Sequence, residues 1–154
     1  MQQDASITYF PVGNGDTSLM TLPDSNSDKT LRILLDCNLR QAKTDSGGND
    51  IFDVEAYIKE VLARDPEGHV HLDVFILTHA DEDHCRGFKR VFYQGDPAKF
   101  SKSDAEADLI IVDELWFAPR IFWPYDGDLS ADGQAFKDEA QRRIDHRLQR
   151  QSRP

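Results

Sequence analysis

The spacing of hydrophobic residues near the start of the chain predicts short strands. Residues 6–12 and 17–22 mix β-branched and aromatic side chains, and the Gly-Asn-Gly-Asp sequence over 13–16 favours a tight turn between them. After a polar loop, a third apolar run over 31–35 ends at Asp36. We therefore expect antiparallel hairpins that bury one face of a sheet.

The spacing becomes helical after Asp50, which we expect to be the N-cap of a helix that ends before Pro66. Residues 72–78 are nearly all apolar, as in a strand that is covered on both faces. We expect a short helix over 88–92 and an irregular polar segment over 94–107.

The last third of the chain adds one strand and one helix. Residues 109–117 return to strand character, and residues 134–149 carry a narrow apolar stripe at helical spacing. The order of elements predicts an α/β fold of the mixed α+β kind, with a mixed, largely antiparallel sheet.

Composition narrows the class of protein. A length of 154 residues with 39% hydrophobic residues suits one domain with a real core. The formal charge of -10 repels phosphate backbones, so a phosphate-bearing substrate would have to be attracted by metal. The start of the chain lacks the basic segment of a signal peptide, and no apolar run approaches the roughly 18 residues of a membrane span. We therefore expect a cytoplasmic protein without membrane association, with reduced cysteines.

The richest chemistry follows the apolar strand over 72–78. His79, Asp81, Asp83 and His84 are spaced His-x-Asp-x-Asp-His, and these side chains bind divalent metals through nitrogen and oxygen. A tight loop directs alternate residues toward two neighbouring ions more readily than it surrounds one ion. The alternative is a helix start at which Asp81 or Asp83 caps the backbone and the histidines are surface polar residues.

The motif resembles the His-x-His-x-Asp-His signature of metallo-β-lactamase-fold hydrolases, with Asp81 in place of the second histidine. It is most similar to the ComEC-like branch, the hydrolase domains related to the competence DNA-uptake channel. Two further motifs carry the resemblance in the right order, namely Val-Gly-Asn-Gly-Asp over 12–16 and Leu-Leu-Asp-Cys-Asn over 34–38. The three motifs together span about half of the chain.

The resemblance implies the first half of a metallo-β-lactamase-like αββα sandwich. Residues 1–154 would form a single domain, the N-terminal portion of that fold, with the C-terminal half and its remaining metal ligands absent. His79 and Asp81 would bind a first ion, and Asp83 and His84 a second.

The resemblance also implies roles for three carboxylates. Asp83 would be the catalytic residue that orients the nucleophile. Asp36 and Asp16 would lie behind the ligands, where Asp36 fixes a histidine tautomer or a water.

The implied cofactor is Zn2+ in a two-metal site, and the carboxylate of Asp81 would let Mn2+ or Mg2+ replace it. The implied activity is hydrolysis of phosphodiesters, in nucleic acids or nucleotides, by a metal-bound hydroxide. We expect little activity from this short chain by itself. The competing interpretation is a catalytically incomplete interaction module that needs a partner chain, which would be the missing half or a second copy.

Five other residues have both a binding and a structural interpretation. His69 and His71 alternate along a strand, as metal ligands or, as we favour, as polar residues at a strand edge. The sequence from Asp128 to Glu139 has the spacing of a calcium loop, although an ordinary N-capped helix start is favoured. His146 faces away from the apolar stripe of the last helix and is expected to be solvated.

Cysteines and aromatic residues also leave alternatives. Cys85 follows a ligand near a helix start, where a thiol pKa can fall, so it is a redox-sensitive thiol, a metal ligand or, as we favour, a small packed residue. A regulatory disulfide with Cys37 is a further alternative. A dense aromatic group would stack bases or, as we favour, belong to the core or to a partner interface. Its members are Trp116, Phe117, Phe122, Trp123 and Tyr125.

Overall fold

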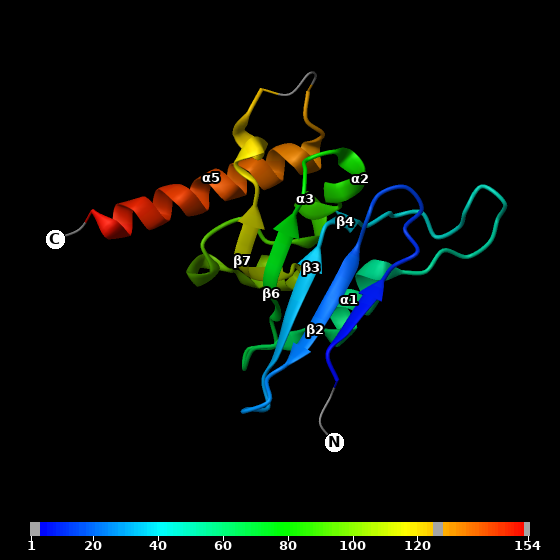
Figure 1. Ribbon diagram of the computed structural model, residues 1–154, viewed down its shortest axis with the longest axis horizontal. Helices are drawn as coiled ribbons and strands as arrows, with labels where there is room; N and C mark the ends of the chain where they lie inside the picture. The colour runs from blue at the N-terminus through cyan, green and yellow to red at the C-terminus, as the bar shows by residue number, and fades with distance from the viewer. Residues whose placement is uncertain (1–3, 125–127, 153–154) are drawn as a thin grey trace.

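The computed structural model describes residues 4–124 and 128–152, and within them it has a mixed sheet of six strands and five α-helices (Figure 1). The mixed α+β class predicted from the sequence is confirmed. The strands of the sheet are β1 (Ser6–Tyr9), β2 (Ser18–Pro23), β3 (Thr30–Leu35), β5 (Ala63–Arg64), β6 (Val70–Leu77) and β7 (Ile111–Phe117), and β4 (Cys37–Asn38) lies outside it. The helices are α1 (Val54–Val61), α2 (Glu82–Cys85), α3 (Phe88–Val91), α4 (Lys102–Glu106) and α5 (Ala131–Gln151), with 3-10 turns η1 (Pro97–Lys99) and η2 (Pro119–Phe122).

Strand pairing brings the ends of distant segments together. Strands β1, β2 and β3 form the expected antiparallel hairpins, while β6 pairs in parallel with β3 and β7 and antiparallel with β5. The arrowheads of β3, β6 and β7 therefore point to one edge of the sheet, where α2 lies (Figure 1). Asp36 follows β3 and donates its backbone N–H to Ile76 O of β6 at 2.8 Å. The end of β3 is thus fixed beside the start of the His-x-Asp-x-Asp-His motif.

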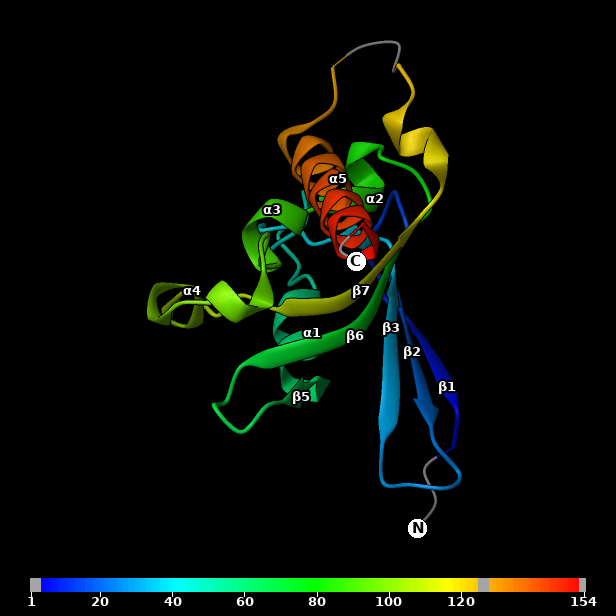
Figure 2. The ribbon, with the colours of Figure 1, turned by 90° about the vertical axis from the view of Figure 1, so that its left-hand side faces the viewer.

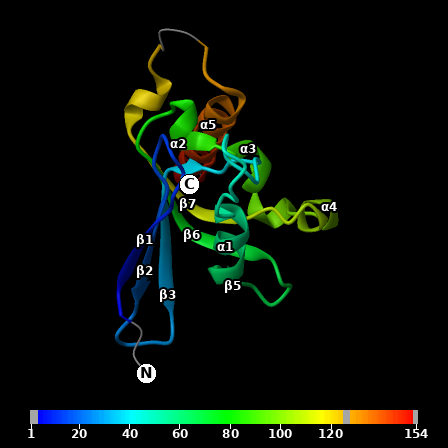
Figure 3. The ribbon, with the colours of Figure 1, turned by 90° about the vertical axis from the view of Figure 1, so that its right-hand side faces the viewer.

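Helices α1, α3 and α5 lie on one side of the sheet (Figures 2 and 3). Phe75 of β6 anchors this side, because its ring contacts those of Phe88, Phe92 and Phe136 at centroid separations of 5.2–5.8 Å. All four rings are buried. The hydrophobic core therefore lies between the sheet and these helices, and it supports α3 directly behind the metal motif.

The opposite face of the sheet carries no α-helix within the described residues (Figure 2). The strand register shows that this face is also apolar. Cross-strand partners point to the same face, so the strand register identifies its members. Exposed hydrophobic side chains of this face include Tyr9, which is 78% exposed. Its hydrophobic residues are Ile7, Tyr9, Met20, Leu22, Leu31, Ile33, Leu35, Val74, Ile76 and Trp116. The expectation that helices or loops cover β6 on both faces is met on one face only.

The larger differences from the sequence prediction concern helices. Helix α1 is capped by Asp53, whose Oδ1 accepts the N–H of Ala56 at 2.9 Å, and not by Asp50, which forms a β-bridge with Thr44. The segment over 94–107 contains η1 and α4, where a capping box begins a helix too short for periodicity to reveal. Helix α5 begins three residues earlier than predicted. No described helix has the length and apolar character needed to cross a bilayer.

Candidate metal centre

The carboxylate of Asp36 organises the end of β6. Asp36 is 1% exposed and has a φ of 54°, which turns the chain sharply after β3. Its Oδ1 accepts the backbone N–H of Thr78 at 2.8 Å, and its Oδ2 accepts the Thr78 hydroxyl at 2.6 Å and lies 2.8 Å from His84 Nδ1. A carboxylate only accepts hydrogen bonds, so Nδ1 of His84 donates, and in the neutral imidazole Nε2 then carries the lone pair.

The hydrogen bonds of Thr78 determine the tautomer of His79 in the same way. The Thr78 hydroxyl proton points to Asp36, so Thr78 Oγ1 accepts from His79 Nδ1 at 2.9 Å. Nε2 of His79 therefore also keeps its lone pair. The two imidazole rings lie with centroids 3.7 Å apart, so two nitrogen acceptors are presented side by side.

The carboxylates of Asp81 and Asp83 lie near the two imidazole rings. Asp81 Oδ2 lies 3.4 Å from His79 Nε2, and Asp83 Oδ1 lies 3.9 Å from His84 Nε2. The structure therefore brings all four motif residues together as two imidazole–carboxylate pairs. Ligand atoms of Asp36, His79 and His84 lie within 4.8 Å of one another, which makes this group a candidate to hold a metal ion. Imidazole nitrogens and carboxylate oxygens are ligands that suit a divalent cation.

The side chain of Asp81 does not cap helix α2. Asp81 occupies the N-cap position of α2, yet its side chain accepts no capping hydrogen bond from the described backbone. Its carboxylate lies beside the ring of His79 instead.

Asp16 is exposed in the β1–β2 loop, and within the described part of the chain its carboxylate makes no hydrogen bond or ion pair with the motif. The loop itself touches α2, because a Cβ added at Gly15 would lie 2.0 Å from the carbonyl oxygen of Asp83. Asn38 holds the loop in this position by donating its side-chain amide to the carbonyl of Asn14. The turn motif over 12–16 thus supports α2 by backbone contact.

Sequence reasoning missed Thr78 and Arg120. Thr78 precedes the motif and connects Asp36 to His79 through its hydroxyl, and a hydroxyl residue directly before the first histidine was the available signal. Arg120, on η2, lines a small pocket together with His79 and Phe117. Arg120 and His79 therefore border the same pocket, and nothing in the spacing of the sequence indicates it.

The cysteines are packed residues. Cys37 and Cys85 are both buried and form a β-bridge between β4 and α2. Burial raises the pKa of the Cys85 thiol to about 12, and the charge of Asp132 adds to the effect, while a hydrogen bond with Ser130 opposes it. The alternative of a low-pKa thiol at a helix start is wrong, because desolvation outweighs the position near the helix.

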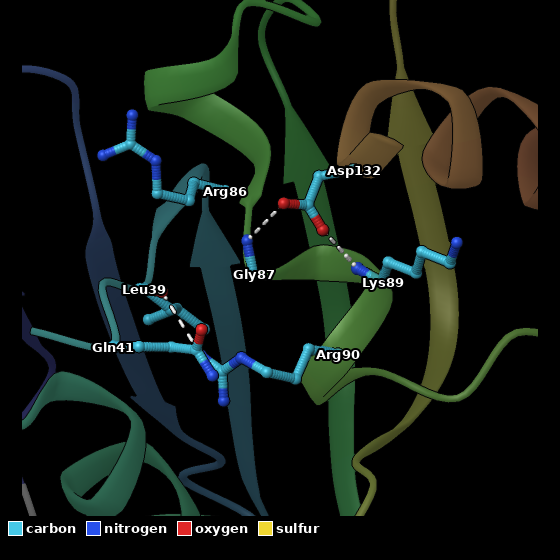
Figure 4. A pocket seen from close by; sticks show the side chains of 7 residues that line it. All are labelled: Leu39, Gln41, Arg86, Gly87, Lys89, Arg90 and Asp132. Carbon is cyan, nitrogen blue, oxygen red and sulfur yellow. Dashed lines mark hydrogen bonds between the residues drawn. The ribbon is translucent and has the colours of Figure 1, made fainter. Parts of the chain in front are cut away.

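A larger cavity of about 480 Å³ lies beside α3 (Figure 4). Asp132 of α5 reaches into it and accepts the backbone N–H groups of Gly87 and Lys89 at 2.9 and 2.8 Å. Arg86 and Arg90 border the cavity, but they form ion pairs with Glu82 and Glu55 respectively. Two of the three basic side chains that line the cavity are therefore neutralised by ion pairs.

The contacts of Asp132 also test the calcium-loop alternative. Ser130 Oγ accepts the N–H of Gly133 at 3.1 Å as the N-cap of α5, while the Asp132 carboxylate is bonded to backbone N–H groups on α3. The favoured interpretation, an ordinary N-capped helix start, is confirmed.

The aromatic group divides into two parts. Phe117 packs edge-on against Phe122 and Phe136 in the core, whereas Trp116 and Trp123 are exposed. Tyr125, its fifth member, lies outside the described residues. His146 is exposed on α5, as predicted.

Comparison of the chain with protein-family models, with curated proteins and with solved structures finds no match.

Proposed function

We propose that this chain is a metal-dependent hydrolase of the metallo-β-lactamase type, ComEC-like, with the architecture of the first half of an αββα sandwich. The observation that carries the proposal is the pairing of two Nε2 lone pairs with two carboxylates at one edge of the sheet. Four electron-pair donors in one place repel one another, and a divalent cation relieves that repulsion.

His79 and Asp81 would hold a first ion, and His84 and Asp83 a second. Zn2+ suits the imidazoles best, and the two carboxylates make Mn2+ or Mg2+ acceptable. The metal would supply a nucleophilic hydroxide near neutral pH and offset charge on the attacked group. Asp36 holds the His84 tautomer through a 2.8 Å contact, and Asp83 orients the nucleophile from an exposed position on α2.

Phosphodiesters in nucleic acids or nucleotides are the proposed substrate class. Arg120 borders the pocket beside His79 and would bind a phosphate oxygen there. The net charge of -10 disfavours long polynucleotides, so small phosphodiesters suit the chain better.

The test is hydrolysis of bis(p-nitrophenyl) phosphate by the purified chain with Zn2+ or Mn2+. Because we expect little activity from this short chain by itself, we expect a low rate that falls at least about 100-fold in Asp83→Ala, the scale of losing one positioned catalytic group. Asp145→Ala, on the exposed side of α5, is the matched control and should leave the rate unchanged. Turnover that survives Asp83→Ala would refute the proposed site.

A second candidate function is an interaction module, and the apolar sheet face favours it. Side chains such as Tyr9 and Trp116 are exposed there, and exposed patches of this kind mark protein-binding surfaces. The proposed partner is a second β-sheet layer, supplied by another chain or by a second copy of this one. In sedimentation experiments Tyr9→Glu should abolish association, whereas Leu148→Glu on α5 should not. A monomer with metal-dependent turnover would favour the hydrolase alone.

A further inference from the structure

A second group of imidazoles and carboxylates lies at the other end of β6. Asp65 begins the turn between β5 and β6, and it is held by bonds from its backbone N–H to His69 O at 3.0 Å and from His69 N–H to its Oδ1 at 2.8 Å. His71 follows on β6, beside Asp113 of β7. The residues are therefore separated from the first centre by the length of a strand.

The protonation of His71 follows from its neighbour. Its Nδ1 lies 2.9 Å from Asp113 Oδ1, and a carboxylate only accepts, so Nδ1 carries the proton and donates. Nε2 then presents a lone pair. This atom is buried from solvent and has no hydrogen-bond partner among the described residues, although it lies 3.4 Å from Asp65 Oδ2.

In the neutral imidazole, two acceptors thus face each other across 3.4 Å, and the side chains that carry them are 27% and 23% exposed. Ligands at about 2.0–2.1 Å from a tetrahedral zinc ion are about 3.3–3.4 Å apart, which matches this separation. The Nδ1–H bond from His71 to Asp113 is also the usual support of a metal-binding histidine, whose second nitrogen donates to a carboxylate.

We infer that Asp65 and His71 are the centre of a second divalent-cation site, suited to Zn2+, in which His69 and Glu67 are the further ligands. Ligand atoms of Asp65, Glu67 and His69 lie within 4.8 Å of one another. The site is independent of the proposed hydrolase function. It would fix the β5–β6 turn to β7 through Asp113.

The competing explanation is that these residues only stabilise the hairpin. The His69–Asp65 bonds suffice for that purpose, at 2.9 Å between ring and carboxylate. They do not account for the orientation of His71 Nε2 toward Asp65 Oδ2 at 3.4 Å, for which there are two explanations. A proton on Nε2 would make an ion pair with Asp65, whereas we infer a cation between the two residues, and the zinc titration distinguishes them.

The experiment is a Zn2+ titration of the full chain, followed by calorimetry and by the side-chain ¹⁵N signals of histidine. The double variant His79→Ala/His84→Ala disables the first centre, and we expect it still to bind zinc and to shift the Nε2 signal of His71. Adding His71→Gln to this background should reduce the zinc bound by one equivalent per chain. Adding His146→Gln, which changes an exposed histidine of α5, should leave the amount of bound zinc unchanged.

Two further variants distinguish a loss of zinc affinity from a folding defect. Glu67→Ala changes an exposed turn residue and should lower the affinity of the second site, with the thermal midpoint of the metal-free chain unchanged. Asp113→Asn should lower that affinity about 10–100-fold while keeping the stoichiometry. An unchanged number of zinc equivalents after His71→Gln, or no zinc bound by the His79→Ala/His84→Ala variant, would overturn the inference.

Discussion

The Asp36 carboxylate lies 2.8 Å from the ring Nδ1 of His84, although 48 positions separate the two residues in sequence. The contact exists because β3 and β6 run in parallel and end at one edge of the sheet. It fixes the proton of His84 on Nδ1 and turns Nε2 toward Asp83. The metal-binding form of the ring is therefore prepared by the fold before any ion binds.

The substitution Asp36→Asn tests whether Asp36 holds the His84 ring in the form that can bind a metal. The substitution keeps an acceptor for the N–H of Thr78 but replaces the oxygen facing His84 by an NH2 donor. We expect Zn2+ affinity at the first centre to fall about 10–100-fold, measured by chelator competition. The free energy of unfolding should fall by about 1–3 kcal/mol. Unchanged affinity would show that Asp36 does not position the ligand.

Gly15→Ala tests the contact between the β1–β2 loop and α2. The glycine has a φ of 88° and no room for a Cβ beside the carbonyl oxygen of Asp83. Gly48→Ala is the matched control, because its φ is 80° and a Cβ there meets no atom within 4 Å. Gly15→Ala should destabilise the fold by about 1–3 kcal/mol more than the control in urea unfolding. Equal losses would mean that only the backbone angle matters.

Because the Cys85 thiol is buried, we predict that the stability of the fold depends on pH. Its pKa is about 12 in the fold, above the ordinary value of 9.0, so the folded state holds the proton more tightly. This contribution is complete below about pH 9 and is lost as the pH rises toward 12. Wild type should lose stability more steeply over that interval than Cys85→Ala. Rapid alkylation of Cys85 in the native chain at neutral pH would contradict this account.

Glu139 tests how α5 is attached to the sheet. Its side chain is 1% exposed and pairs with Arg142 and Arg143 at 2.7 Å, and Arg143 also donates to Val112 O of β7 at 2.7 Å. Glu139→Ala should cost about 3–5 kcal/mol, because two cations lose their partner.

The exposed pair Lys102–Glu106, at 3.7 Å, supplies the control for that experiment. Glu106→Ala should change the free energy of unfolding by less than about 0.5 kcal/mol. Equal effects of the two substitutions would show that the buried carboxylate does not hold α5 to β7.

The hairpins, β6, β7 and α5 could be predicted from the sequence because each has a strong period or an apolar run ended by turn residues. The N-cap of α1 could not, since Asp50 and Asp53 are both aspartates before the apolar stripe, and only the bridge between Thr44 and Asp50 decides between them. Helix α4 has five residues, too few to show a helical period.

For the candidate centre, spacing alone identified His79 and His84 as neighbours. The contacts of Thr78 and Arg120 depend on where β3 and η2 end in space, which no local pattern encodes. His71 was favoured as a strand-edge residue because its partner Asp113 lies 42 positions away, on a strand whose pairing was unknown.

The most direct test of the central claim is a Zn2+ titration of the purified chain that follows the side-chain ¹⁵N signals of His79 and His84. We predict that the Nε2 signals of both rings shift as zinc binds, while Nδ1 of both remains protonated. In His79→Ala/His84→Ala the zinc bound at this centre should be lost. If zinc binds while both Nε2 signals stay unchanged, the proposed metal centre is wrong.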